Sequence, residues 1–528
     1  MRSVMKHNFS QVPTVSIPRS TFDRSHGLKT TFDGGYLVPV LVDEIYPGDS
    51  LKCDMAGFCR LSTPTFPIMD NMYLDTFFFF VPSRQLWTNF KKFHGEQVDP
   101  GDSIAFTIPQ NVVNNAANMS LADYMGIPTQ VAYNNSVNAL PFRAYWHIWN
   151  EWFRDQNLQD STDASWSTGD GPDTQSVELT TDVLKRGKRH DYFTSCLPFL
   201  QKGDAVQLSL GTDAPIFGDG MDFDGGKDNA NWLQVRSSAG SGALLRTLNY
   251  DGSEAGGAII YGGGNADGTA EIKTDLSQAT ASTVNELRQA VQVQRLLERD
   301  ARSGTRYAEI IKSHFGVTMP DITYRPEYLG GGSTPINITP VARTDTAPGA
   351  LGGFGTGAFS GHGFVKSFTE HGYIIGIVNV RADLTYQEGL DKMWSRSTRY
   401  DFYYPTLAHL GEQAVLNKEI YVDATDLGDG TSEEVFGYQE RFAELKYKRS
   451  MITGKMRSND AATLDPWHLS IEFGDTPTLD DTFVPDDPPI DRVIVTDTEP
   501  HFIMDGYFRY LHTRPMPTYS IPGFIDHF

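Results

Sequence analysis

The chain has 528 residues, of which 39% are hydrophobic and 21% are charged, a composition typical of an ordered, soluble protein and unlike that of a disordered one. Its 66 acidic and 44 basic residues give a formal net charge of -22, which excludes a general attraction to nucleic acid but allows a local basic patch. Cys53, Cys59 and Cys196 are too few and too scattered for a disulfide framework or a zinc site. Without a recognisable signal peptide or membrane span, we expect the protein to be made and first folded in a cytoplasm.

The first part of the chain predicts β-strands within residues 36–50, 51–61 and 73–82, separated by Pro and Gly. The third of these contains four consecutive phenylalanines. In a strand, Phe77 and Phe79 would point to one face of the sheet and Phe78 and Phe80 to the other. Leaving one pair in water would forgo about 1.5 to 3 kcal/mol per ring. We therefore expect this sheet to be covered on both faces.

Helices are predicted directly after the phenylalanine run and further along the chain. The first is short and lies around Leu86, Phe90 and Phe93. The second, residues 141–157, begins with a proline and has an aromatic stripe at helical spacing: Phe142, Tyr145, Trp146, Trp149, Trp152 and Phe153. The third, residues 284–300, follows a capping box formed by Thr283 and Glu286. Their apolar stripes offer a cover for the second face of the sheet.

Residues 211–275 differ in composition from the rest of the chain. They hold 14 Gly in 65 positions, with ten acidic and four basic residues. This pattern predicts an irregular, exposed excursion. Asp222, Asp224 and Asp228 do not match a calcium-binding loop, because the glycine and the distal glutamate are misplaced, so we interpret them as a solvated acidic loop.

The last part of the chain again predicts strands, in residues 373–382, 467–473, 491–497 and 501–512, whereas the glycine-rich stretch 352–363 is expected to be a flexible loop. No repeat of 20 to 50 residues is present. If strands from both ends form one sheet system, the middle of the chain consists of long insertions between strands. The strand spacing favours a mainly β sandwich or barrel over βαβ units.

No catalytic constellation is recognisable. His362, His371 and His409 lack the spacing of metal ligands, and no Ser or Cys lies in a nucleophile motif. We therefore expect a protein that is not an enzyme and that has no cofactor and no metal site. The alternative is a β-sandwich protein that acts on carbohydrate or binds glycans through its long loops.

Two basic clusters are candidates for binding a nucleic-acid backbone, because cations and neighbouring aromatic rings together suit unpaired nucleotides. One lies within residues 184–193 and includes His190; the other lies within residues 441–457 and begins with Arg441. A solvated or ion-paired surface is the alternative interpretation. The DNA-facing candidates are Lys185, Arg186, Lys188, Arg189, Lys446, Lys448, Arg449, Lys455 and Arg457.

Five collinear motifs carry a resemblance to a known family. They are "LPFRAYWHIWNEWFRDQNL" (140–158), "KRHDYFTSCLPFLQKGD" (188–204), "ELRQAVQVQRLLERDARSGTRYAEIIKSHFGV" (286–317), "RPEYLGG" (325–331) and the ending "RPMPTYSIPGFIDHF". The sequence resembles the major capsid protein of the Microviridae, particularly the gokushovirus branch. The resemblance spans the chain on both sides of residues 211–275, which match no pattern of the family.

The resemblance implies a mainly β fold: an antiparallel eight-stranded jelly-roll barrel with long, partly helical loop insertions, as a single domain over residues 1–528. It also implies a structural protein of the virion that forms a T=1 icosahedral homo-oligomer around a circular single-stranded DNA genome, assembled in the cytoplasm of a bacterial host. The implied partners are further copies of the chain, the DNA, an internal scaffolding protein, a DNA pilot protein, a small DNA-binding protein and a host cell-surface receptor, without membrane insertion.

Within that framework, residues 211–275 are expected to form a variable surface protrusion that takes part in host attachment. A segment so rich in Gly and Asp cannot bury enough apolar area to offset its ordering unless copies from neighbouring subunits pack together. The alternative is a tolerated surface loop without a receptor role. The side chains expected to supply the shared contact are Ile216, Phe217, Trp232, Leu244 and Leu245.

Overall fold

The computed structural model describes residues 17–519, apart from 114, 132–134, 163–167, 172, 174–181, 345–350, 423–432 and 497; between residues 208 and 282 it describes only the backbone of five short strands. The chain divides into two compact units. One comprises Met1–Leu200 with Ser303–Phe528, and the other Gln201–Arg302.

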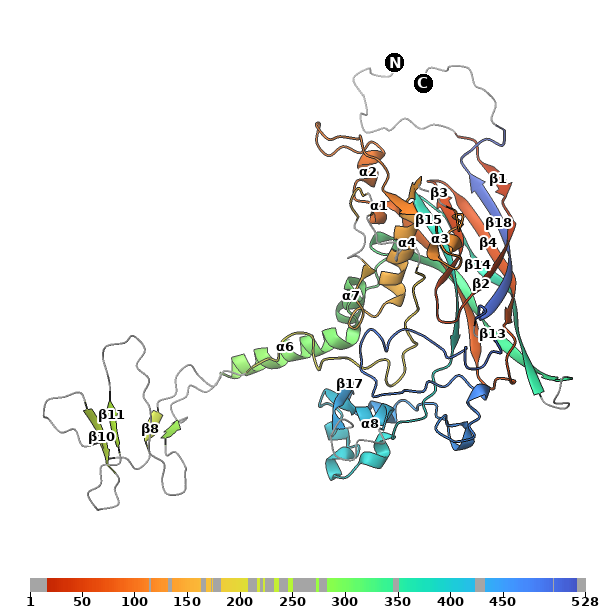
Figure 1. Ribbon diagram of the computed structural model, residues 1–528. Helices are drawn as coiled ribbons and strands as arrows, with labels where there is room; N and C mark the ends of the chain where they lie inside the picture. The colour runs from red at the N-terminus through yellow and green to blue at the C-terminus, as the bar shows by residue number, and fades with distance from the viewer. Residues whose placement is uncertain are drawn as a thin grey trace. The chain divides into compact units, whose positions relative to one another are not determined.

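The larger unit is built on one antiparallel, curled sheet of nine strands among the described residues (Figure 1). In order across the sheet these strands are β1 (Ser20–Asp23), β18 (Phe502–Arg514), β4 (Ser50–Leu61), β14 (Leu351–Ser367), β13 (Glu327–Ala342), β5 (Met72–Pro82), β15 (Gly372–Ala382) and β3 (Val38–Ile45). The ninth strand, β2 (His26–Phe32), pairs with β18 beyond the end of β1. Strands from both ends of the chain thus form one sheet system, as predicted.

This order is that of a jelly roll, in which two four-stranded halves fold over a shared core. One half consists of β1 and β2 as a common edge, then β18, β4 and β14; the other consists of β13, β5, β15 and β3. The halves are joined where β13 pairs with β14, and rings from opposite halves meet between them, with Phe78 and Phe364 centred 5.4 Å apart. The predicted eight-stranded jelly-roll class is confirmed.

The phenylalanine run divides between two cores, as the strand periodicity predicts. Phe78 and Phe80 are fully buried between the halves of the barrel. Phe79 is buried, and Phe77 partly buried, in a second apolar cluster on the opposite face of β5. Both faces of β5 and of its neighbour β15 are therefore covered by protein.

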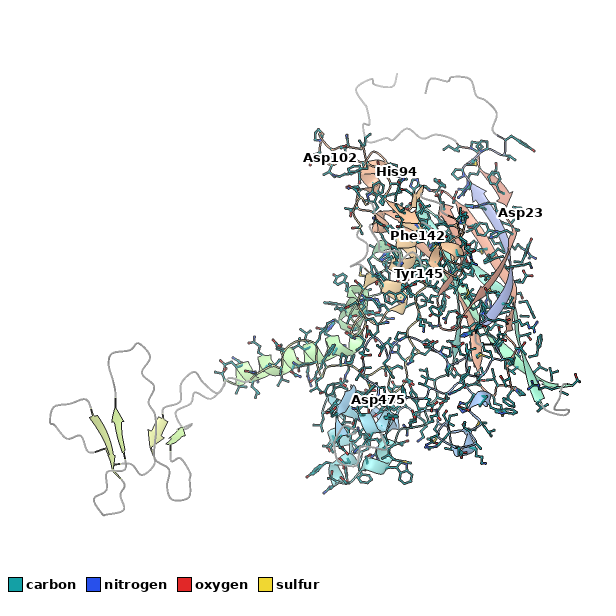
Figure 2. The ribbon with its side chains drawn as sticks, in the orientation of Figure 1. Asp23, His94, Asp102, Phe142, Tyr145 and Asp475 are labelled. Atoms are coloured by element: carbon teal, nitrogen blue, oxygen red, sulfur yellow. The ribbon has the colours of Figure 1, made fainter. Side chains whose placement is uncertain are left out.

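Helical segments between β5 and β13 supply the second cluster. They are α1 (Ser83–Leu86), α2 (Phe90–Phe93), α3 (Leu121–Tyr124) and α4 (Leu140–Ile148), with a π-helical turn at Trp149–Phe153 continuing α4; a further helix, α7 (Tyr307–Phe315), lies in the same insertion outside this cluster. Phe142 and Tyr145 lie on α4 (Figure 2), and the Tyr145 hydroxyl donates to the Leu37 carbonyl (2.8 Å) while accepting from the Leu184 amide (3.0 Å). The predicted helix 141–157 is confirmed as far as Phe153. The short pair β6 (Gln110–Val113) and β7 (Asn135–Asn138) lies in the same insertion.

The second long insertion separates β15 from β18. It contains the pair β16 (Glu412–Leu416) and β17 (Val435–Glu440), the short helix α8 (Asn417–Ile420) and several 3₁₀ turns. The strands predicted at 467–473 and 491–497 are wrong. The described residues of these segments form loops, and the apolar side chains Leu469, Val493 and Ile494 fill the barrel core.

The glycine-rich stretch 352–363 is also different from its prediction: it forms the middle of β14, not a flexible loop. The glycines allow close approach between strands. A Cβ at Gly363 would overlap the Cys53 carbonyl of β4, and one at Gly332 of β13 would overlap the His362 ring. Here glycine marks tight backbone packing in a strand, which composition alone does not distinguish from a loop.

The smaller unit contains the helix α6 (Val284–Ser303), which begins at the predicted capping box: the Thr283 amide donates to Glu286 (2.8 Å), and the Glu286 amide donates to the Thr283 hydroxyl (3.2 Å). Its strands are β8 (Ile216–Gly218), β9 (Asp222–Phe223), β10 (Trp232–Arg236), β11 (Arg246–Asn249) and β12 (Ile272–Thr274). The predicted contacts of Ile216, Phe217, Trp232, Leu244 and Leu245, and the acidic loop around Asp224, lie outside the described side chains. Within the described residues, no helix is long and apolar enough to cross a membrane.

Candidate functional site

The first basic cluster lies in a backbone strap that ties three parts of the larger unit together. The Leu37 amide donates to Leu184 (2.9 Å), and the Arg186 amide donates to Gly35 (2.9 Å), next to the start of β3. On the other side of the strap, the backbone carbonyl of Arg186 accepts a hydrogen bond from the Asp486 amide (2.7 Å). Gly35 has φ +82°, and a Cβ there would overlap the Asp486 carbonyl, so this junction requires glycine.

Arg186 is held by a carboxylate of the barrel. The Asp75 carboxylate of β5 accepts hydrogen bonds from the guanidinium groups of Arg186 (2.8 Å) and of Arg381 on β15 (2.9 Å). It also accepts one from the Ser333 hydroxyl of β13 (2.5 Å). Burial alone would raise the pKa of Asp75, but the hydrogen bonds from Ser333 and Arg186 outweigh it, and the pKa is lowered. The guanidinium of Arg186 thus stabilises an ionised carboxylate inside the fold.

The two lysines of this strap also have partners within the chain. Lys185 pairs with Asp487 (2.8 Å) and lies over the Tyr36 ring. Lys188 donates to the Phe483 carbonyl (2.6 Å) and lies 4.3 Å from the centre of that ring, and burial lowers its pKa.

The surroundings of this strap are acidic. The neighbouring Asp486 is buried, and its desolvation raises its pKa to about 6 despite nearby Arg186 and Lys188. Beside Lys185 is an open hollow of about 370 Å³, which is lined by acids as well as by this one lysine. The acidic residues of that lining are Asp33, Asp487, Asp491 and Glu499. Such a lining does not favour phosphate.

The second basic cluster follows β17 and is partly neutralised. Lys446 pairs with Glu440 and Lys448 with Asp391, each at 2.7 Å, although both lysines remain exposed. Arg449 is partly buried, and its guanidinium donates to the backbone carbonyls of Glu419 (2.5 Å) and Gly389 (2.7 Å). Burial lowers the pKa of Arg449.

Three of the nine DNA-facing candidates combine exposure with the absence of an ion pair to any described residue: Arg189, Lys455 and Arg457. The nine side chains do not form one patch through their own contacts, because one cluster braces the barrel and the other lies within the second insertion. Their role toward DNA stays a prediction.

The sequence analysis did not predict one buried ion pair. Arg143 of α4 is fully buried, pairs with Asp173 through two hydrogen bonds and also donates to the Leu86 and Gly169 carbonyls (3.0 Å each). A single arginine within a strongly aromatic helix is the only sequence signal for it, and its partner lies 30 residues away. Among the described residues, no group of three or more His, Cys, Asp or Glu side chains is arranged to hold a metal ion.

The sequence of the chain is similar to those of capsid proteins. A family model described as Capsid protein (F protein) matches residues 10–524. The Capsid protein VP1 of Bdellovibrio phage phiMH2K is 45% identical over 535 aligned positions, covering 99% of this chain and 98% of that protein. Capsid protein VP1 of Chlamydia phage 1 is 42% identical, with 99% and 98% covered, and that of Spiroplasma virus 4 is 34% identical, with 98% and 97% covered.

Proposed function

Since the chain belongs to the phage capsid protein (F protein) family, we propose that it assembles into a T=1 icosahedral shell around a circular single-stranded DNA genome. The observation that carries this proposal is end-to-end similarity to three capsid proteins, combined with a jelly roll whose strand connections are unusually long. Loops far longer than the usual ~4 to 6 residues suit subunits that tile against neighbours. The chain's place is the virion, and the gokushovirus branch is the proposed lineage.

The proposed interior contact with DNA rests on exposed cations of the two clusters. Arg186, Lys188 and Arg449 are used inside the fold, so the structure favours Arg189, Lys455 and Arg457 as the side chains free to meet phosphate. Replacing these three with Gln should leave shells that form but enclose less nuclease-protected DNA, with a weaker dependence of DNA binding on salt. Unchanged packaging would refute the proposed role of these cations.

Host attachment by residues 211–275 is the second part of the proposal. Its support is compositional: the segment is acidic and rich in glycine, so an inward position would bring it against the genome's negative charge. Replacement of the segment by a short Gly-Ser linker should give particles that assemble but no longer adsorb to the host. Normal adsorption and infectivity would show that the segment is a tolerated loop.

The shell itself is tested by expression in a bacterial host together with an internal scaffolding protein, followed by sedimentation and electron microscopy. Closed isometric particles are expected. A chain that remains a stable monomer under conditions in which the phiMH2K relative assembles would overturn the proposal.

A further inference from the structure

The second insertion carries a large apolar surface that the described chain does not cover. Within residues 390–410, Trp394 is 70% exposed, Tyr400 71%, and Phe402 and Tyr403 52% each. At about 200 Å² per aromatic side chain, these four alone leave roughly 500 Å² of ring surface in water. This summed area is comparable with the area of the largest apolar patch on a typical monomer, about 300 to 600 Å². The other exposed apolar members of the stretch are Leu390, Met393, Tyr404 and Leu410.

A second segment extends this surface. Leu445, Tyr447 and Met451 are each about half exposed, and their segment is bonded to the first: Arg396 pairs with Glu444 at 3.0 Å, and Leu390 and Tyr447 line one small hollow. We call the exposed apolar side chains of residues 390–410 and 445–451 the aromatic surface.

The aromatic surface is held in shape by its own contacts. Asp401 accepts from the amides of Ser397 (3.0 Å) and Thr398 (2.7 Å), which fixes a 3₁₀ turn at Arg399–Asp401. Tyr403 packs edge-on against Phe442, with ring centres 5.2 Å apart. Side chains that are ordered before binding lose less entropy on binding, so a surface of this kind suits a specific partner.

The charges around the aromatic surface argue against a nucleic-acid partner. Arg396, Lys446 and Lys448 are each paired with a carboxylate of the same chain. The exposed Arg399 lies over the Tyr404 ring, 5.3 Å from its centre, so most of the cations at this surface offer little net positive charge to phosphate. The combination of Trp, Tyr, Phe, Met and Arg with mostly paired charges is instead the composition of protein–protein interface cores.

We propose that the aromatic surface is an interface with a second copy of this chain. The inference rests on the proposed shell function, which requires every subunit to contact copies of itself. The exposed apolar area supports a second copy of the chain as the partner. The four rings alone supply more than half of the ~800 Å² that each partner buries in a standard interface. A symmetric shell also presents every subunit with the same neighbouring surfaces, so a contact that covers this patch on one copy covers it on every copy.

A cysteine introduced into the aromatic surface gives a direct test. Cys53, Cys59 and Cys196 are all buried, and burial raises the pKa of Cys53 and Cys59 to about 12, so the native thiols react slowly. Ser397→Cys places a near-isosteric thiol on an exposed position between Trp394 and Tyr400. Maleimide labelling is measured in the free subunit, in particles with and without DNA, and in guanidine-unfolded protein as the total.

We expect labelling in the free subunit to be complete and labelling in both kinds of particle to fall at least tenfold. Equal labelling of free subunits and particles would overturn the inference. Protection of the introduced thiol from labelling only in DNA-filled particles would also overturn the inference, because the DNA would then cover the aromatic surface in place of a second copy of the chain.

A substitution experiment separates this inference from the proposed function. The double variant Trp394→Ser, Tyr400→Ser should keep the thermal midpoint of the free subunit but lower the yield of sedimenting particles at least tenfold. Val98→Ser, at a 77% exposed valine in a charged loop, is the matched control and should assemble normally. Normal assembly of the double variant would refute the interface while leaving the shell function intact. If the unaltered chain forms no particles, the proposed function is wrong and the inference falls with it.

Discussion

Strands β15 and β18 are long strands of the same barrel, yet one is buried on both faces and the other on one. Every residue of β15 is buried, whereas β18 alternates buried and exposed residues from Phe502 to Leu511. The difference arises because the insertion between β5 and β13 lays α4 and its neighbours over β5 and β15, while no described element of that kind covers β18 and β4. A continuous run of buried residues therefore identifies a strand that lies under an insertion, and alternation identifies a strand with one uncovered face.

The cross-strand pairs show the same contrast residue by residue. On the bare face, Ile503 lies opposite Arg60, and Leu511 opposite Lys52, so apolar and charged side chains share the surface. On the covered half, Ile375 lies opposite Phe79 and Ile377 opposite Phe77. The covered half should thus be sensitive to truncation of an outward-facing ring, and the bare half should not.

The largest effect is expected from Phe79→Ala. Phe79 is buried under the helical insertion, and removal of a buried Phe ring costs about 3 to 5 kcal/mol. Urea unfolding of the free subunit should show this loss. A loss below about 1 kcal/mol would mean that the insertion does not cover this face in solution.

Arg186→Met should cost less, about 1 to 3 kcal/mol, because Asp75 keeps Arg381 but loses one charged hydrogen bond in a buried site. The same variant should package a normal amount of DNA per particle. Reduced DNA packaging at unchanged stability would instead indicate that Arg186 contacts the DNA on the interior surface.

Asp486→Asn should raise the free energy of unfolding at pH 7.5 and leave it nearly unchanged at pH 4. The pKa of Asp486 is raised to about 6 by burial. Its protonated form therefore contributes stability at low pH, and that contribution is lost as pH rises through 6. Asn keeps the neutral form, so the gain at pH 7.5 is on the order of 1 to 3 kcal/mol. Equal effects at both pH values would show that Asp486 ionises normally in the folded chain.

The smallest effect is expected on the bare face. Tyr507 of β18 is 53% exposed, and Tyr507→Ser should change the stability of the free subunit by less than about 0.5 kcal/mol. A loss comparable to that of Phe79→Ala would show that a further part of the chain covers β18, and the contrast between the two halves would disappear.

Local periodicity predicted five strands of the barrel (β3, β4, β5, β15 and β18) and the covering helix α4, whereas β13 was not predicted and β14 was predicted in part as a loop. The phenylalanine run required two covered faces, and the aromatic stripe of residues 141–157 predicted the cover. Leu469 and Val493 fill the core from loops, and their alternation with polar residues led to the wrong prediction of strands at 467–473 and 491–497. Where glycine allows strands to approach, as at Gly363, composition gave a false loop.

The contacts of the basic clusters could not be predicted, because they depend on long-range pairing. Arg186 meets Asp75 across 111 residues, and Lys188 meets the Phe483 carbonyl across 295. A run of cations in sequence does not reveal which of them the fold uses internally. The aromatic surface was missed for the opposite reason: its rings lie in a segment without strand or long-helix periodicity, so only the structure shows that they are uncovered.

The most direct test of the account is the mass of the assembled particle, measured by charge-detection mass spectrometry on DNA-free shells purified from the bacterial host. A closed T=1 shell predicts one dominant species of about sixty copies of the chain. A distribution dominated by monomers, or by small oligomers that do not close, would contradict the claim that this chain is a self-assembling shell subunit.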